Sequence, residues 1–202
     1  TNSLLVGTDS TGTLSSADGN TGVGTGVLGA LTTGDNNVAV GLNALDANTT
    51  GQSNTAVGAC ALSTNTTSNS LTAVGFCALS ASTGAGNTAV GDRALRLNTT
   101  GASNSGVGYL SLWSNTSGDY NTALGGSSLR YNTTASNNVA VGHSSLETNT
   151  TGSNNTAVGK SALLVNTTGT QNTAVGLCAL DANTTGANNV AIGVQALDSN
   201  TT

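Results

Sequence analysis

One seventeen-residue phrase, close to T-T-G-x-x-N-T-A-V-G-x-x-A-L-x-x-N, recurs from Thr32 to the last residue of the chain. Its glycine returns every seventeen residues, except for one interval of sixteen between Gly75 and Gly91. A leucine stands four residues after each glycine of the array, from Leu45 to Leu197. A fixed period of this length means that one structural unit is stacked on copies of itself, so we expect a repeat architecture.

Each unit contains a short segment with the period of a β-strand. In the copy at 54–58, Thr55 and Val57 point to one face and Asn54 and Ala56 to the other. The threonine position holds valine in three other copies, so we expect this Thr/Val face to be at least partly buried: Val38, Val139 and Val190. The apolar positions miss the 3.6-residue spacing of a helix, and Asn-Thr-Thr-Gly is rich in turn formers. We predict an all-β fold, a parallel β-solenoid or β-roll of about twelve rungs of seventeen residues.

Rungs that pair edge to edge stack equivalent residues into columns. We expect a core ladder formed by the aliphatic residue before each glycine and the leucine after it: Val40, Leu45, Val57, Leu62, Val74, Leu79, Val90, Leu95, Val107, Leu112, Leu124, Leu129, Val141, Leu146, Val158, Leu163, Val175, Leu180, Ile192 and Leu197. The asparagine before each Thr-Thr predicts a turn ladder, broken only at Ser82: Asn48, Asn65, Asn98, Asn115, Asn132, Asn149, Asn166, Asn183 and Asn200. The asparagine of Asn-Thr-Ala-Val-Gly predicts a second ladder, broken only at Leu71.

The register continues towards the N-terminus. Gly7 and Gly24 keep the spacing, and Val6, Val23 and Leu28 fall in the apolar columns. We therefore expect residues 1–31 to form degenerate rungs that are continuous with a ten-rung array at 32–202.

Composition excludes several classes of function. The apolar residues, 36% of the chain, recur in register, which argues against disorder. Only four residues are basic and the net charge is −5, so we expect no nucleic-acid partner. No apolar run approaches the roughly 20 residues of a membrane span, so we expect no membrane insertion by this segment. Without an initiating methionine or a signal peptide, we expect a processed product or a segment of a longer protein.

Each rung offers few large apolar side chains, which suggests that one chain does not bury enough surface alone. An alanine column, from Ala39 to Ala191, is consistent with the close approach of another chain. We expect a parallel homotrimer in which three rungs share a core. The alternative is that these alanines fill a narrow interior within one chain.

Two copies of the phrase resemble a known family. Asn-Val-Ala-Ile-Gly at 189–193 and Asn-Val-Ala-Val-Gly at 37–41 resemble the N-S-V-A-I-G signature of YadA-like trimeric autotransporter adhesin heads. The form Asn-Thr-Ala-Val-Gly-x-x-Ala-Leu is similar to repeats of phage tail fibres. Over residues 20–202, this resemblance implies a left-handed parallel β-roll of three chains, an extracellular rod on a cell surface or virion that binds a host glycan or protein. The Asn-Thr-Thr-Gly insert makes these rungs longer than the adhesin repeat.

Residues with catalytic or ligand chemistry are sparse. The single histidine, His143, lies in a variable column after the glycine, which is typical of a surface position. Four acids share the column after the leucine, but only the last two are in adjacent rungs: Asp46, Glu147, Asp181 and Asp198. Neither calcium ligation nor a glycosidase pair is indicated. We expect no enzyme activity, no metal and no cofactor.

Three cysteines occupy one column, two residues after the glycine: Cys60, Cys77 and Cys178. Cys60 and Cys77 are in adjacent rungs, where stacking brings their backbones within about 5 Å, a separation that a disulfide permits. Free thiols at a variable position are the alternative.

Two features leave functional alternatives open. The Asn-Thr-Thr triplets are formal N-glycosylation sequons, which a structural role in the turn ladder also explains. Stacked threonines can bind ice, although adjacent residues of Thr-Thr face opposite ways in a strand.

Aromatic and basic residues in neighbouring central rungs suggest a binding patch: Tyr109, Trp113, Tyr120, Arg130 and Tyr131. We interpret the chain as a structural, non-enzymatic rod, the shaft or head of an extracellular fibre, surface adhesin or phage tail fibre. The alternative is a soluble ice-binding or ligand-binding β-solenoid.

Overall fold

The computed structural model describes residues 3–7 and 16–202, and within them it contains strands and turns but no helix. Twelve strands of three residues each follow one another along the chain: β1 Leu4–Val6, β2 Thr21–Val23, β3 Val38–Val40, β4 Thr55–Val57, β5 Thr72–Val74, β6 Thr88–Val90, β7 Ser105–Val107, β8 Thr122–Leu124, β9 Val139–Val141, β10 Thr156–Val158, β11 Thr173–Val175 and β12 Val190–Ile192.

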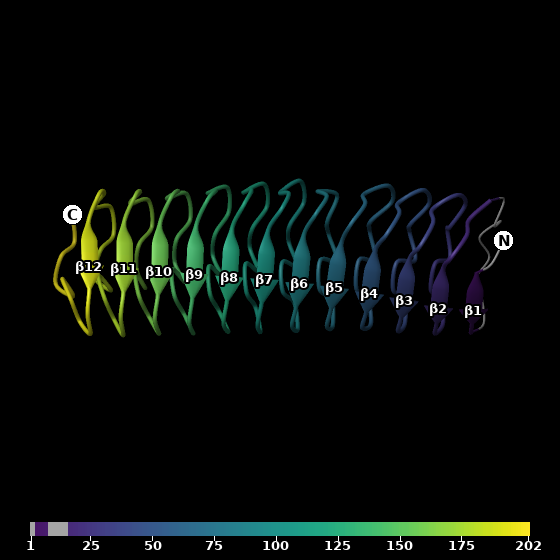
Figure 1. Cartoon of the computed structure of the whole chain (residues 1–202), viewed down its shortest axis with the longest axis horizontal. Helices are drawn as coiled ribbons and strands as arrows, with labels where there is room; N and C mark the ends of the chain where they lie inside the picture. The colour runs from purple at the N-terminus through teal and green to yellow at the C-terminus, as the bar shows by residue number, and fades with distance from the viewer. Residues whose placement is uncertain (1–2, 8–15) are drawn as a thin grey trace.

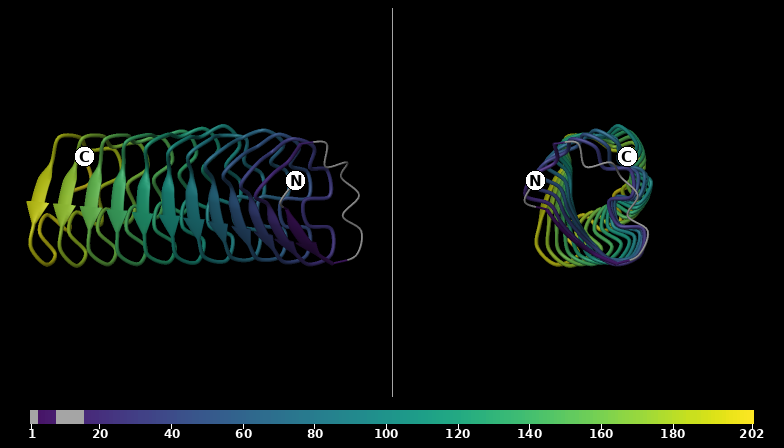
Figure 2. Two further views of the ribbon diagram at one scale, coloured as in Figure 1. Left: turned by 45° about the vertical axis from the view of Figure 1, so that its right-hand side comes forward. Right: turned by 90° about the vertical axis from the view of Figure 1, so that its right-hand side faces the viewer.

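The strands form one parallel sheet in sequence order (Figure 1). Each strand pairs in register with the next, so that Ala56 lies opposite Ala73 and Val57 opposite Val74. The register survives the short interval, where Thr72 pairs with Thr88. The strands line one wall of a coil and the turns form the rest of it (Figure 2). The predicted parallel β-solenoid is confirmed, with a repeat of about seventeen residues and about eleven turns.

We call one turn of the coil a rung and name it by its glycine, so the Gly58 rung spans 58–74 and the Gly75 rung spans 75–90. β1 and β2, from the segment predicted as degenerate rungs, pair with the array through β3. The part of that prediction that falls on residues 8–15 lies outside the described residues.

The interior of the coil is lined by alanine, leucine and asparagine. The alanines at the centres of β3–β6 and β8–β12 and the leucine column are buried, except at the C-terminal end, where Leu197 is half exposed. Gly106 replaces one strand alanine, and a Cβ atom placed there would lie 3.3 Å from Leu95 Cδ1. The alanine column therefore packs against the leucines of its own chain. This corrects the interpretation that it marks another chain, and the narrow interior is the right alternative.

The valine half of the predicted core ladder lies outside the core. Val40, Val57, Val74, Val90, Val107, Leu124, Val141, Val158, Val175 and Ile192 point out of the coil and are partly or largely exposed. The period-two alternation is correct, but the inside and outside faces are reversed. The physical reason is that the interior beside the strand accommodates only alanine next to the leucines, while the adjoining asparagines find hydrogen-bond partners there.

Two backbone requirements explain the most regular columns. The glycine after each strand has a φ near that of Gly58, +136°, and a Cβ atom on Gly58 would overlap the carbonyl group of Gly75 in the next rung. The leucines of the column four residues after the glycine are also left-handed, for example Leu129 with φ +49°. β-Branched side chains are especially unfavourable at such φ values, so leucine, rather than valine or isoleucine, fills this column.

Candidate interaction surfaces

The most ordered polar arrangement is buried and holds the rod together. The strand-leading ladder consists of the asparagine before each strand from β2 on, except at Leu71: Asn20, Asn37, Asn54, Asn87, Asn104, Asn121, Asn138, Asn155, Asn172 and Asn189. In a typical step, Asn37 donates from its backbone N and from Nδ2 to Asn20 Oδ1, at 2.9 and 3.0 Å. Asn37 Nδ2 also donates to Gly51 O at 2.9 Å. These bonds satisfy amide groups that are costly to bury unpaired.

The turn ladder is built in the same way. Asn132 Nδ2 donates to Asn115 Oδ1 at 2.8 Å and to Ala135 O at 3.0 Å, and Asn132 Oδ1 accepts from Asn149 at 3.0 Å. Every member of the turn ladder is fully buried except the half-buried Asn200. The nitrogen that would carry an N-linked glycan is therefore inside the folded coil and already donates twice at Asn132, which favours the structural reading of these sequons.

The outer face of the sheet carries no charged residue along the described strands. Its two columns are the first and third residues of each strand, which are Thr, Ser, Val or Leu in the first column and Val, Leu or Ile in the second. We call these two columns the outer face. Between β3 and β11 the valines of the second column are mostly half-buried, and the most exposed members are Val107 and Leu124, at 38% and 41%. The described acids and bases all lie in the turns.

Further exposed apolar side chains flank this outer face. They occupy the column just after the strand glycine and include Leu42, Phe76, Tyr109, Leu177 and Val194. Together with the outer face, this column contains most of the large apolar side chains that are exposed in the described chain. Asp92, His143 and Lys160 interrupt this flanking column, so the continuous uncharged strip along the described strands is the outer face itself. A strip of this kind is typical of an interaction surface.

The predicted binding patch is divided by the structure. Arg130 Cζ lies 4.9 Å from the centre of the Tyr131 ring and 6.0 Å from that of Trp113. On the following rung, Glu147 Oε1 lies 3.7 Å from Arg130 Nη1. Trp113, Arg130 and Glu147 occupy the column after the leucine in consecutive rungs, so the spacing of seventeen could have identified the acid as a member. We call these four residues the Arg130 cluster.

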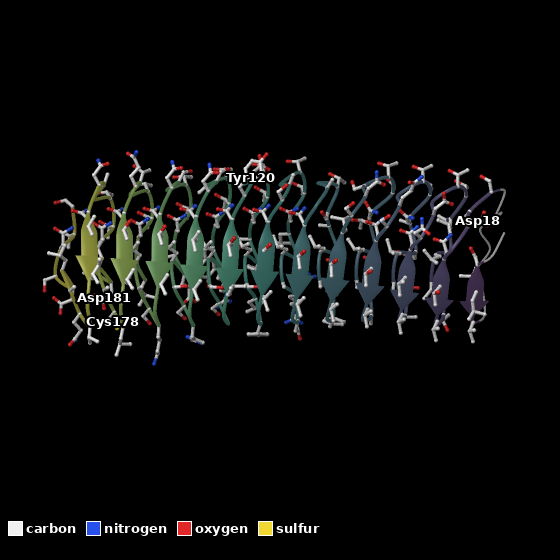
Figure 3. All side chains as sticks on the ribbon, in the orientation of Figure 1. Asp18, Tyr120, Cys178 and Asp181 are labelled. Atoms are coloured by element: carbon white, nitrogen blue, oxygen red, sulfur yellow. The ribbon has the colours of Figure 1, made fainter. Side chains whose placement is uncertain are left out.

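The other two members of the predicted patch are elsewhere. Tyr120 lies in the turn before β8. Figure 3 shows it along the edge of the rod opposite Asp181. Asp181 occupies the same column as Trp113, Arg130 and Glu147, so Tyr120 lies away from the Arg130 cluster. Tyr109 follows the strand glycine and belongs to the column that flanks the outer face. A second stacked pair that the sequence analysis missed joins Arg93 to Phe76, with 5.5 Å between the guanidinium carbon and the ring centre. The sequence could have indicated this pair, because Arg93 lies in the rung that follows the rung of Phe76.

The remaining titratable residues of the described chain are dispersed among the turns. His143 is exposed, and its Nδ1 atom lies 3.0 Å from Ser144 Oγ. Burial raises the pKa of the Asp46 carboxyl group, while the backbone N–H groups of Ala47 and Asp46 lower it in part. Within residues 3–7 and 16–202, no three metal-ligating side chains come together and no pocket is found. The same residues contain no helix of a length and apolarity that could cross a membrane.

The three cysteines are free and half-buried. Burial raises the pKa of the Cys77 thiol, and the neighbouring Cys60 adds to this effect. Comparisons with family models, with curated proteins and with solved structures give no match to this chain.

Proposed function

We propose that this protein is a structural, non-enzymatic rod, the shaft or head of an extracellular fibre such as a surface adhesin or a phage tail fibre. In this proposal, three parallel copies pack through their outer faces. The observation that carries the proposal is the uncharged outer face along the whole sheet, with an aliphatic residue at every position of its second column.

The dimensions of the rod support assembly along its length. Twelve strands at about 4.8 Å per rung give an outer face roughly 55 Å long. A partner that packed along this face would cover exposed Val and Leu side chains without burying a charge on the strands. Closed rotational symmetry around a shared axis would direct the same face of every copy inwards. The resemblance of residues 189–193 to trimeric adhesin heads favours three copies over two.

The test is the mass of the particle in solution and its response to charge. We expect about 58 kDa by analytical ultracentrifugation, three times the 19.5 kDa of one chain. Val141→Lys combined with Val158→Lys places two charges on the outer face and is expected to give monomers. Thr134→Lys combined with Thr151→Lys adds the same charges at exposed turn positions just before the same two strands, and these variants should remain trimeric. A monomeric wild-type protein would overturn the proposed assembly.

The same surface supports a second candidate, a soluble ice-binding solenoid. The outward residues of β4 and β5 are threonine and valine, stacked in register, so the outer face presents a regular array of hydroxyl and methyl groups. The Thr-Thr of the turns, by contrast, uses its first hydroxyl for the backbone of the next rung, as in Thr49 Oγ1 to Thr66 O at 3.0 Å. A monomer that shapes ice and shows thermal hysteresis would favour this candidate, and a trimer without hysteresis would remove it.

Within the fibre proposal, the Arg130 cluster is the surface on which we place contact with a host glycan or protein. Tyr131 is 39% exposed and stacks on Arg130, so an aromatic face and a cation are displayed together. Trp113→Ala and Tyr131→Ala should weaken attachment to the host surface, while Tyr120→Ala, on the opposite edge, should not. Unchanged attachment in all three variants would exclude this role for the cluster.

A further inference from the structure

The junction between the Gly58 rung and the Gly75 rung differs from the regular junctions of the array. Here the strand-leading ladder meets Leu71 in place of asparagine, and the turn ladder meets Ser82. The backbone N–H group of Leu71 still donates to Asn54 Oδ1 at 3.0 Å, as the asparagines of this ladder do. The Leu71 side chain, however, has no oxygen that could accept a hydrogen bond from Asn87. Ser82 Oγ donates to Gly84 O in its own turn at 3.2 Å. Both amide ladders are therefore interrupted at the same junction.

The backbone of the turn is also altered at this junction. Between regular rungs, Thr49 N donates to Thr66 O at 2.8 Å. Thr83 is the equivalent acceptor for the next step, and its carbonyl group instead accepts from Ser68 Oγ at 2.6 Å. The Gly75 rung is one residue shorter, and its turn runs from Ser82 through Thr83 directly to Gly84. The strands remain paired, so the loss is confined to the side of the coil that the ladders hold.

Cys60 and Cys77 join the same two rungs. Both stand two residues after the strand glycine, and Cys77 N donates to Ala59 O at 2.9 Å, which places the cysteines side by side. They share the same left-handed backbone, with φ values of 58° and 51°. A rung spacing of about 4.8 Å is within the range of Cα separations in disulfides. Cys178 has no cysteine in the neighbouring rungs and provides an internal comparison.

We propose that Cys60 and Cys77 are a site of oxidative modification that closes to a disulfide and secures the junction where both amide ladders are broken. The oxidant is a small-molecule disulfide such as oxidised glutathione. One cysteine thiolate attacks it, forming a mixed disulfide and releasing one glutathione thiolate. The second cysteine thiolate then attacks the protein sulfur and displaces the second glutathione. The two cysteine thiols lose two protons and two electrons, and the glutathione disulfide becomes two thiols.

The acidity of the thiols predicts that the disulfide forms slowly at neutral pH. Burial and the neighbouring Cys60 raise the pKa of Cys77, which lowers its thiolate fraction at neutral pH. Closure should therefore accelerate as the pH rises. Since the bond closes a short loop of one rung, it restricts the unfolded chain and the local opening of the two rungs alike. The inference depends on the stacking of the rungs and is independent of the proposed trimer.

The experiment uses the full chain with Cys178→Ser, so that only the pair can react. After oxidised glutathione is added, intact mass should fall by two hydrogens without a glutathionyl adduct. The matched control adds Cys60→Ser, and in it Cys77 should stop at the mixed disulfide. Stable mixed disulfides on both cysteines, an unreacted pair or a disulfide between two chains would overturn the proposal.

Hydrogen exchange then tests the effect on the junction. The Leu62 and Thr72 amides donate across it, to Ala78 O and Asn87 O, at 3.1 and 3.0 Å. Oxidation should slow their exchange by roughly tenfold to a hundredfold. The amides of Leu146 and Thr156, in distant regular rungs, should be unchanged. A disulfide that forms but leaves Leu62 and Thr72 unprotected would contradict the securing role.

Discussion

The rungs from β6 to β12 differ from the junction between the Gly58 and Gly75 rungs in how their interiors are connected. Beyond β6, both ladders contain asparagine at every step, and typical members such as Asn121 and Asn132 bond both to the preceding asparagine and to a turn carbonyl. At the junction between the Gly58 and Gly75 rungs both ladders are interrupted, yet the strand register and the leucine column continue. The comparison shows that backbone pairing and the apolar wall define the coil, while the amides add stability where they are continuous.

The largest expected effect breaks a ladder in the regular region. Asn132→Leu leaves Asn115 Oδ1 and one Asn149 N–H group without partners inside the coil, and Ala135 O keeps only its bond from Asn121 Nδ2. Each such group costs about 1–3 kcal/mol, so we expect a loss of about 3–5 kcal/mol in the free energy of unfolding. Urea denaturation followed by circular dichroism measures it. Thr134→Ala, at an exposed position of the same turn, is the control and should cost less than about 0.5 kcal/mol.

A second pair of variants separates backbone strain from burial. Leu129 and Leu71 are both fully buried, but only Leu129 has a positive φ, +49°. Leu129→Ile forces a β-branched residue into the left-handed region and should cost about 2–3 kcal/mol. Leu71→Ile should cost less than about 1.5 kcal/mol, as volume-conserving core changes usually do. Equal losses in the two variants would contradict this reading of the leucine column.

The junction should respond to repair. Ser82→Asn places an amide beside Asn65 and Asn98, where the present link is a 3.3 Å bond from Asn98 Nδ2 to Ser82 Oγ. We expect a gain of about 1 kcal/mol, close to the net value of one added hydrogen bond. Thermal unfolding of the reduced protein reports it. A destabilised variant would show that the shortened turn, and not the missing amide, determines the junction.

The smallest effect lies outside both ladders, at Asp46. Burial raises the pKa of this carboxyl group, and its Oδ1 atom is buried without a partner. Because the folded state binds the proton more tightly than the unfolded state, stability falls as the pH rises through the pKa of the folded protein. Asp46→Asn should therefore stabilise the protein by a few tenths of a kcal/mol at pH 7. The gain should disappear in acid, where the wild-type carboxyl group is already neutral.

The period of the sequence predicted the coil because every unit must bury its apolar positions against its copies. It did not assign the faces of the strand, because alternation defines two faces without saying which is inside. The decisive signal was which column varies: the first strand residue is Thr, Ser, Val or Leu, whereas the buried centre is alanine in nine of the twelve strands. The left-handed leucines could not be predicted, since leucine has no intrinsic preference for that region and adopts it here because burial requires it.

The central claim is that stacked side-chain amides fill one side of the interior while the valines face outwards. Hydrogen exchange of asparagine side-chain NH₂ groups, measured by NMR, tests it most directly. We predict that Asn115, Asn132 and Asn149 exchange far more slowly than the exposed Asn154 and Asn188. If the amides of Asn115, Asn132 and Asn149 exchanged as fast as those of the exposed asparagines, the ladders would not exist in solution, and this description of the interior would be wrong.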